Sequence, residues 1–412
     1  MIYLRKIFNQ KSNRLLIYID QAIISGSNFL IAIVLTRLLG IESYGQFALI
    51  WMITFFFSSI QQSLLIAPLY TLSNKYDKTE KFDFHNTLKG LQNILSLISF
   101  GVSLILLFFL YYPAFNLVEI LVISLSISGY LHLDFYRRIM FLKKKTLKLL
   151  ILDCIYYPLS IILLIVTSEL DSIQLFNHFF NLFVLSVICL SILHKELKFS
   201  INIEQIKRQW YTIWEYSKFL IYTSLLQFLT GNLFLILTGT ILSSAHLGTI
   251  RICQNIMGVL HILFNAFENY IPIKASREYN QHGYKGLKLY YHKLLKQTGP
   301  LILLFCALIA IFNTVLLDFI YNVTSQTTSV VLMLFSLIYI FIFVGTLQRF
   351  FIRTIEKNKI IFRGYLIATI ISLIICFPIV THFGVIGATI GLLVTQITYV
   401  TYYQFMINKS YD

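Results

Sequence analysis

Two long apolar stretches near the start of the chain, joined by a very short turn, constrain the fold more than any other feature. Residues 15–39 and 47–72 are mostly aliphatic and aromatic, and the turn between them reads IESYGQ. Each stretch is long enough to cross a hydrocarbon core of about 30 Å at about 1.5 Å of rise per residue. We therefore expect a transmembrane helical hairpin, because so short a turn cannot contain a domain.

The composition extends this conclusion to the whole chain. Hydrophobic residues make up 57% of the sequence and charged residues 12%, whereas soluble domains contain about 25% charged residues. The sequence therefore predicts an integral membrane protein. In a soluble chain the net charge of +15 would suggest nucleic-acid binding, but here the basic residues sort by side of the membrane, and we expect no nucleic-acid partner.

Apolar stretches recur along the rest of the chain, and together they predict twelve membrane spans. All but two of the 33 lysines and arginines fall at the N-terminus, in even-numbered loops or in the C-terminal tail. By the positive-inside rule, this distribution predicts a multi-pass protein with both termini in the cytoplasm. The predicted spans are approximately 15–39, 47–72, 91–112, 117–136, 149–167, 173–193, 219–242, 249–273, 297–317, 329–350, 364–383 and 386–407.

The first hairpin turn has a counterpart about half a chain later. Leu39-Gly40 and Gly45 correspond to Leu242-Ser243 and Gly248, and a weaker copy begins at Phe383-Gly384. Parallel repeats are common in transporters, which bind their substrates where the repeats meet, although chance similarity between short Leu/Gly/Ile strings is an alternative. We predict an all-α fold of two pseudo-symmetric six-helix bundles around a central cavity. The predicted divisions are 1–197, a cytoplasmic amphipathic linker at 198–218, and 219–412.

Arg37 and Arg251 are the two basic residues that break the positive-inside pattern. Each lies near the outer end of its predicted span and beside one copy of the repeated turn. They could extend to the lipid headgroups or pair with an acid such as Glu42. Alternatively, they could line a cavity and bind a phosphate group through forked hydrogen bonds.

Polar residues line one face of the eighth predicted span. With about 100° per residue, Arg251, Asn255, Gly258, Asn265 and Asn269 share this face. A polar face suits a wet passage, although a hydrogen-bonded seam between helices is an alternative. On the first span, Asn28 and Arg37 do not share a face of a straight helix. The candidate substrate-binding residues are Arg37, Arg251, Asn28, Gln254, Asn255, Asn265 and Asn269.

Two intramembrane acids near the cytoplasmic ends of their spans, Asp20 and Glu268, are candidates for coupling to H⁺ or Na⁺. Both could instead pair locally with lysines, and local ion pairing is favoured for Asp134 and Asp153, which flank the basic fourth loop. No metal-ligand spacing, nucleotide-binding motif or catalytic constellation is evident. The sequence therefore predicts neither an enzyme nor a bound metal or cofactor.

Three segments resemble a known family. DQAIISGSNFLIAIVLTRLLGIESYGQFAL (Asp20 to Leu49), LGTIRICQNIMGVLHILFNAFENYIPIKAS (Leu247 to Ser276) and FGVIGATIGLLVTQ (Phe383 to Gln396) are similar to the polysaccharide-biosynthesis flippases. This family belongs to the multidrug/oligosaccharidyl-lipid/polysaccharide exporter superfamily. The motifs are loose patterns of Gly, Leu and Tyr that indicate the superfamily better than the substrate.

The resemblance implies a flippase of the bacterial inner (cytoplasmic) membrane that works by alternating access. Its substrate would be an oligosaccharide on a polyprenyl diphosphate carrier, moved to the outer leaflet for surface polysaccharide such as O-antigen (lipopolysaccharide) or capsule. Membrane lipids and other polysaccharide-assembly proteins would be its partners. The alternatives are a multidrug or small-cation antiporter of the same superfamily and, with less support, a membrane-embedded glycosyltransferase or acyltransferase.

Overall fold

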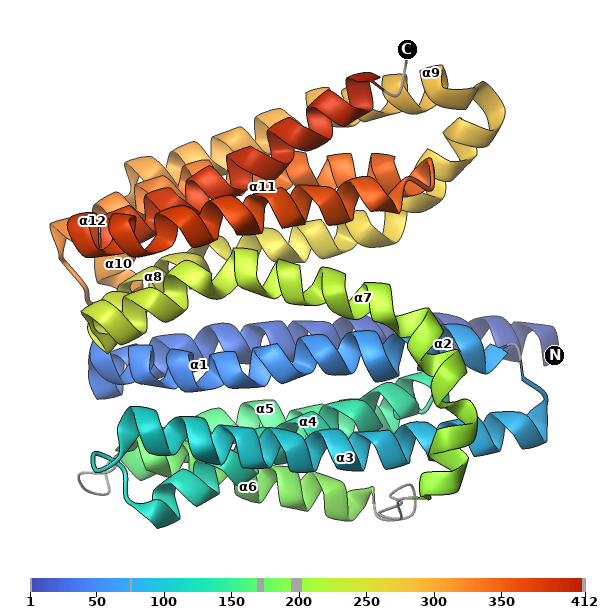
Figure 1. Ribbon diagram of the computed structural model, residues 1–412, viewed down its shortest axis with the longest axis horizontal. Coiled ribbons are helices and arrows are strands. Elements are labelled where there is room, and N and C mark those ends of the chain that lie inside the picture. The colour runs from blue at the N-terminus through green and yellow to red at the C-terminus, as the bar shows by residue number, and fades with distance from the viewer. Residues whose placement is uncertain (1, 75, 169–173, 194–201, 410–412) are drawn as a thin grey trace. The chain divides into compact units, whose positions relative to one another are not determined.

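Helices form nearly all of the chain that the computed structural model describes, which comprises residues 2–74, 76–168, 174–193 and 202–409. No strand occurs within these ranges. The helices are α1 (Ile2–Gln61), the π-helix η1 (Gln62–Ile66), α2 (Ala67–Thr71), the 3₁₀-helix η2 (Leu72–Asn74), α3 (Lys78–Tyr111), α4 (Leu117–Leu142), α5 (Thr146–Ser168), α6 (Gln174–Ile192), α7 (Ile203–Leu237), the π-helix η3 (Thr238–Leu242), α8 (Ser244–Met257), α9 (Val259–Ile311), α10 (Asn313–Tyr321), α11 (Gln326–Thr354) and α12 (Asn358–Lys409) (Figure 1).

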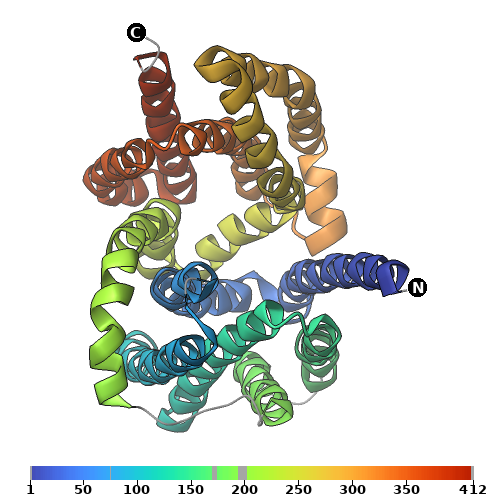
Figure 2. The same cartoon turned by 90° about the vertical axis from the view of Figure 1, so that its right-hand side faces the viewer.

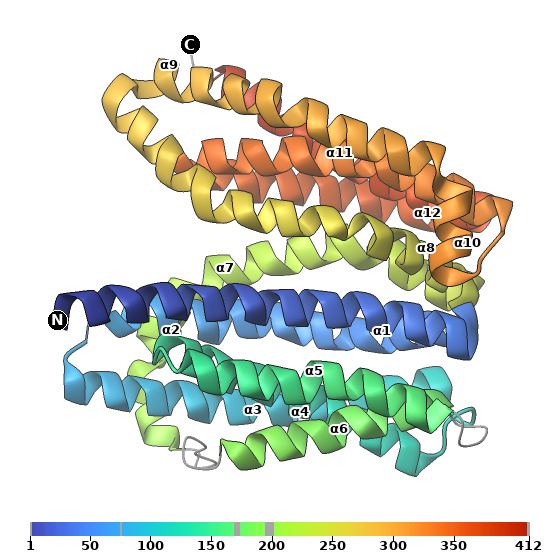
Figure 3. The ribbon, with the colours of Figure 1, turned by 180° about the vertical axis from the view of Figure 1, so that it is seen from behind.

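Glycines with positive φ divide the three longest helices. Gly40 in α1, Gly283 in α9 and Gly384 in α12 have φ of 85°, 61° and 58°, each with an extended ψ, and only glycine adopts this combination readily. Each helix consequently folds back on itself, as α9 does in Figure 3. Nine helical stretches among the described residues are long and apolar enough to cross a membrane, and those containing Gly40 and Gly384 are hairpins. The all-α, multi-pass architecture expected from the sequence is confirmed.

The repeated sequence motif forms a turn in each of its copies. Gly40 and Gly384 turn their hairpins with positive φ, and Ser243 separates η3 from α8 with φ −175°. A φ of −175° is ordinary extended backbone, so serine can replace glycine there. The Ser243 hydroxyl accepts a hydrogen bond from the backbone N–H of His246 and caps α8.

The described helices divide into two compact units. The N-terminal unit comprises Met1–Gly40 and Ile50–Leu225, and the C-terminal unit comprises Ile41–Leu49 and Leu226–Asp412. Ile41–Leu49, which we call the hairpin tip, thus packs with the C-terminal unit. Within the N-terminal unit α4 packs against α3, α5 and α6, and within the C-terminal unit α11 packs against α8, α9 and α12 (Figure 2).

The predicted amphipathic linker is not a separate element in its described part. Residues 203–218 form the first half of α7, which continues without interruption to Leu237. Trp210 and Trp214 stack on each other there, with ring centroids 5.7 Å apart. The preceding residues 194–201 lie outside the described ranges.

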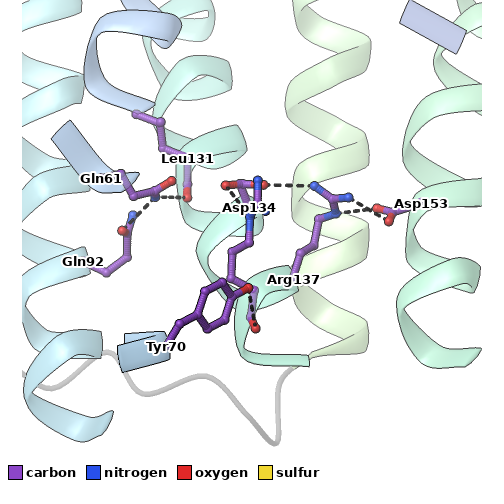
Figure 4. Close-up of polar contacts among 8 residues, drawn as sticks. Gln61, Tyr70, Gln92, Leu131, Asp134, Arg137 and Asp153 are labelled. Carbon is purple, nitrogen blue, oxygen red and sulfur yellow. Dashed lines mark hydrogen bonds and ion pairs between the residues drawn. The ribbon is translucent and has the colours of Figure 1, made fainter. Parts of the chain in front are cut away.

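A buried hydrogen-bond chain joins helices of the N-terminal unit. Gln61 Nε2 donates to Gln92 Oε1 at 2.9 Å and to the carbonyl oxygen of Leu131 at 2.7 Å (Figure 4). Gln92 Nε2 in turn donates to Ser96 Oγ at 3.0 Å. Interhelical hydrogen bonds of this kind hold helices together in lipid, where hydrophobic attraction between helices is weak. They explain why an apolar span tolerates a buried glutamine at position 61.

The hairpin tip approaches α8 through two glycines in corresponding positions of the repeat. An ideal Cβ added to Gly45 would lie 1.7 Å from the carbonyl oxygen of Ser244, and one added to Gly248 would lie 2.2 Å from the carbonyl oxygen of Ile41. Both obstacles are backbone atoms, which cannot move aside as the end of a flexible side chain can. Gly45 and Gly248 are therefore required by a reciprocal close approach of two backbones.

We expect Gly45→Ala to lower the free energy of unfolding by about 1–3 kcal/mol, the usual effect of overpacking. Gly101→Ala in α3 is the matched control, because an added Cβ there meets nothing within 4 Å and alanine is the better helix former by about 0.5–1 kcal/mol. Thermal unfolding of the detergent-solubilised protein, followed by tryptophan fluorescence, measures both. Equal unfolding temperatures for the two variants would contradict the close approach.

Candidate functional site

A cavity of about 420 Å³ lies inside the C-terminal unit. The hairpin tip, α7, α8, α9, α11 and α12 all contribute to its wall. The wall combines one guanidinium group, three amide groups, one imidazole, two phenol groups, and an apolar side of phenylalanine, isoleucine and leucine. The lining residues are Tyr44, Gly231, Arg251, Gln254, Asn255, Gly258, His261, Phe335, Ile338, Tyr339, Ile342, Leu392 and Gln396.

Helix α8 supplies the most polar part of this wall. Arg251, Gln254, Asn255 and Gly258 are spaced i, i+3, i+4 and i+7, which puts them on one helical face. The helix ends at Met257, and Gly258 separates α8 from α9. Gly258 itself has right-handed helical angles (φ −58°, ψ −22°), and His261 of α9 also lines the cavity, so the polar wall continues across this boundary.

Hydrogen bonds orient the polar groups around Arg251. Arg251 Nη1 donates to Gln254 Oε1 at 3.0 Å, and Asn255 Nδ2 donates to Tyr321 Oη at 2.5 Å. Tyr44 of the hairpin tip and Tyr339 of α11 lie close enough to interact electrostatically with Arg251. The guanidinium group is half-buried and faces the cavity with its amide and phenol neighbours.

The described part of the cavity wall carries positive charge and no negative charge. Arg251 is the permanently charged side chain among the described lining residues, and no carboxylate is among them. Arginine presents a planar fork of N–H donors that matches phosphate and carboxylate groups. The arrangement therefore suits an anionic group attached to a larger apolar or neutral portion, and it does not suit an organic cation.

The remaining predicted site residues have different surroundings. Arg37 and Asn28 are exposed on α1 and belong to the N-terminal unit, so the joint action of Arg37 and Arg251 stays a prediction. Glu268 is exposed and does not line the cavity. The side chains of Asn265 and Asn269 lie outside the described part of the chain.

Sequence reasoning missed several residues of this wall. Tyr44, Tyr339 and Gln396 come from three distant segments, and nothing in their local sequence marks them as neighbours of Arg251. The structure also brings His261 of α9 to the wall, with its Nε2 atom 3.0 Å from Tyr339 Oη.

A buried ionic cluster occupies the N-terminal unit. Arg137 of α4 donates to both carboxylate oxygens of Asp153 on α5, with Nε–Oδ1 at 2.5 Å and Nη2–Oδ2 at 2.8 Å, and through Nη1 to Asp134 Oδ1 at 3.0 Å (Figure 4). The Arg138 Nε atom lies 3.5 Å from Asp134 Oδ2. The predicted local pairing of Asp134 and Asp153 is confirmed, although both arginines lie within α4, which continues to Leu142, and not in the fourth loop.

Asp20 of α1 lies against this cluster. Its side chain is 4% exposed, and its Oδ1 atom has no hydrogen-bond partner among the described residues. Both Asp153 and Arg137 are close enough to interact electrostatically with it. Three carboxylates and two guanidinium groups thus meet in this part of the unit, an arrangement with one excess negative charge.

Solved structures identify the fold. An inward closed conformation of the lipid II flippase MurJ superposes with a TM-score of 0.73 over 96% of this chain and 87% of that chain, at 14% sequence identity. The inward-facing conformation of a multidrug resistance MATE family transporter of the MOP superfamily gives 0.71 over 94% and 95%, at 12% identity. This chain has the fold of the MOP superfamily of transporters.

A third similar structure is a MOP superfamily transporter from Pyrococcus furiosus, described by a reverse polarity of its binding pocket. It matches with a TM-score of 0.59 and 14% identity over 96% of this chain and 95% of that chain. These structural neighbours are transporters and a flippase, not enzymes. No family model and no curated protein matches the sequence.

Proposed function

We propose that this protein is a flippase that moves a polyprenyl-diphosphate-linked oligosaccharide from the cytoplasmic to the outer leaflet of the bacterial inner membrane. It works by alternating access, has both termini in the cytoplasm, and serves the synthesis of O-antigen or capsule together with other assembly proteins. The observation that carries the proposal is the cavity in which Arg251 is the charged group among the described lining residues. A diphosphate carries the charge that this guanidinium group would bind.

The surroundings of Arg251 support the same substrate class. Gln254, Asn255 and Gln396 offer amide groups suited to sugar hydroxyls and phosphate oxygens, while Phe335 and Ile342 provide an apolar side. The volume of about 420 Å³ is within the range of about 300–1,000 Å³ typical of small-molecule sites, which suits the headgroup portion of such a lipid. One of the structural neighbours is, by its name, a flippase of lipid II.

A flipping assay tests the proposal. The protein is reconstituted in liposomes with a fluorescent short-chain polyprenyl diphosphate disaccharide, and dithionite reports the fraction of probe in the outer leaflet. We expect rapid exchange of the diphosphate probe and slow exchange of a neutral probe that has the same lipid and sugar but no phosphate. Equal rates for both probes, or export of an organic cation such as ethidium without flipping, would favour the cation antiporter instead.

Asp20 is the acid that we propose for proton coupling. It adds a third carboxylate to a cluster with two arginines, so a single proton would balance the charge of the group. Burial in a low-dielectric region makes such an imbalance unfavourable. Glu268, the other acid proposed from the sequence, is exposed and lacks a comparable set of neighbours among the described residues.

Asp20→Asn should make flipping insensitive to an imposed pH gradient, because the amide cannot take up or release a proton. Glu268→Gln is the matched variant and should retain the response. The measurement is the initial flipping rate in liposomes with and without a gradient of one pH unit, at constant sodium concentration. A normal gradient response in both variants would refute coupling through either acid.

A further inference from the structure

A second arginine lies among the helices of the C-terminal unit, on α11 towards the end opposite the hairpin tip. Arg349 is half-buried, and it donates from Nη1 to Tyr365 Oη at 2.5 Å and from Nη2 to Thr346 Oγ1 at 2.8 Å. Tyr399 and Tyr403 of α12 complete its surroundings. These neighbours are neutral, and within the described ranges no carboxylate forms an ion pair with Arg349.

The face of α11 that carries Arg349 also lines the cavity. Tyr339 and Ile342 are cavity residues, and Thr346 and Arg349 follow at i+7 and i+10 from Tyr339, so all four share one helical face. With about 1.5 Å of rise per residue, Arg349 lies about 15 Å along the helix from Tyr339.

Helix α12 extends the cavity wall in the same direction. Its cavity residues Leu392 and Gln396 are continued by Tyr399 and Tyr403 at i+7 and i+11 from Leu392. The Tyr399 hydroxyl donates a hydrogen bond to Gln396 Oε1, which links the cavity to the tyrosines around Arg349. The charge of Arg349 also acts on His261, a cavity residue of α9.

We propose that Arg349 is a second anion-binding position, which holds a phosphate group of the substrate before Arg251 does. This inference rests on the proposed function, because it assumes that the passage carries an anion. A guanidinium group away from bulk water is stabilised by a full counter-charge far more than by neutral hydroxyls. The bound phosphate supplies that charge, and Tyr365 and Thr346 hold the fork in position between substrates.

Two anion-binding side chains, Arg349 and Arg251, also explain how a strongly charged group can move across the membrane. A single tight site would retain the anion, whereas two successive sites allow it to transfer stepwise. Conduction in channels follows the same logic, since binding at several moderate sites permits both entry and exit. Arg349 is then the site nearer the predicted cytoplasmic loops, and Arg251 is the site nearer the predicted outer loops.

Binding of farnesyl diphosphate to the full chain in nanodiscs tests this assignment, with farnesol as the uncharged control ligand and isothermal titration calorimetry as the readout. We expect Arg349→Gln to weaken farnesyl diphosphate binding about tenfold or more, the effect of losing one strong charge-assisted interaction. Arg349→Lys should retain part of the affinity. Arg353→Gln is the matched control, because Arg353 is exposed one turn later on the same helix, and it should bind normally.

The possible outcomes distinguish a failure of the Arg349 inference from a failure of the proposed function. If Arg251→Gln weakens binding while Arg349→Gln binds like the unaltered chain, Arg349 has only a structural role and the proposed function survives. If the unaltered chain binds farnesol as tightly as farnesyl diphosphate, the anionic substrate itself is wrong. If Arg349→Gln reduces the unfolding temperature, Tyr365→Phe separates the two roles, because it removes a hydrogen bond that positions the fork but leaves the guanidinium charge. We expect Tyr365→Phe to lose much less affinity than Arg349→Gln. A loss of affinity in Tyr365→Phe equal to that in Arg349→Gln would overturn the inference.

Discussion

Arg251→Ala is expected to reduce flipping of a polyprenyl diphosphate substrate by about 100-fold. The variant removes the charged group from the cavity wall, and each hydrogen bond between charged partners contributes about 1.5–3 kcal/mol, which is a factor of roughly 10–100. Arg251→Lys keeps the charge but loses the planar fork, so its rate should lie between those of the alanine variant and the unaltered protein.

Initial rates in reconstituted liposomes provide the measurement, with protein content matched by quantitative blotting. Arg277→Ala is a suitable control, because Arg277 is exposed on α9 and does not line the cavity. Arg37→Ala belongs in the same series, since the sequence predicts that Arg37 also binds the anion. Flipping by Arg251→Ala at the rate of Arg277→Ala would remove the basis of the proposed function.

Arg137→Gln is expected to lower the free energy of unfolding by about 3–5 kcal/mol, because removal of one partner leaves the other charge of a buried pair uncompensated. The side chains of Arg137 and Asp153 are 11% and 0% exposed, and Asp134 and Asp20 add further negative charge beside them. The variant should therefore unfold at a markedly lower temperature in detergent and accumulate poorly in membranes.

Arg138→Gln is the control for this prediction. The Arg138 side chain is 44% exposed and its Nε lies 3.5 Å from Asp134, and exposed pairs contribute about 0–1 kcal/mol. The double variant Arg137→Leu with Asp153→Leu should recover part of the lost stability, because it removes both charges together. If Arg137→Gln and Arg138→Gln unfold at the same temperature, the cluster does not stabilise the N-terminal unit.

The local features of the fold follow from the sequence because the bilayer restricts what a chain can do. Backbone polar groups in hydrocarbon must be satisfied within helices, so long apolar stretches predict the spans, and glycines such as Gly40 and Gly384 mark where the helices turn. The distribution of lysine and arginine predicts the orientation for the same reason, and that orientation stays a prediction. The isolation of Arg251 among outer residues was also sufficient to mark it as a candidate site residue.

The meeting of residues that are distant in sequence depends on long-range packing. Asp20 and Asp153 lie on different helices far apart in sequence, and the packing of α1, α4 and α5 brings both to Arg137. The cavity around Arg251 likewise draws on the hairpin tip and five helices. In sequence, Arg349 is one of many basic residues in the predicted cytoplasmic loops, and the role that we propose for it depends on the face of α11 that it shares with Tyr339. Periodicity reports which side of a helix is polar, but long-range packing determines what that side faces.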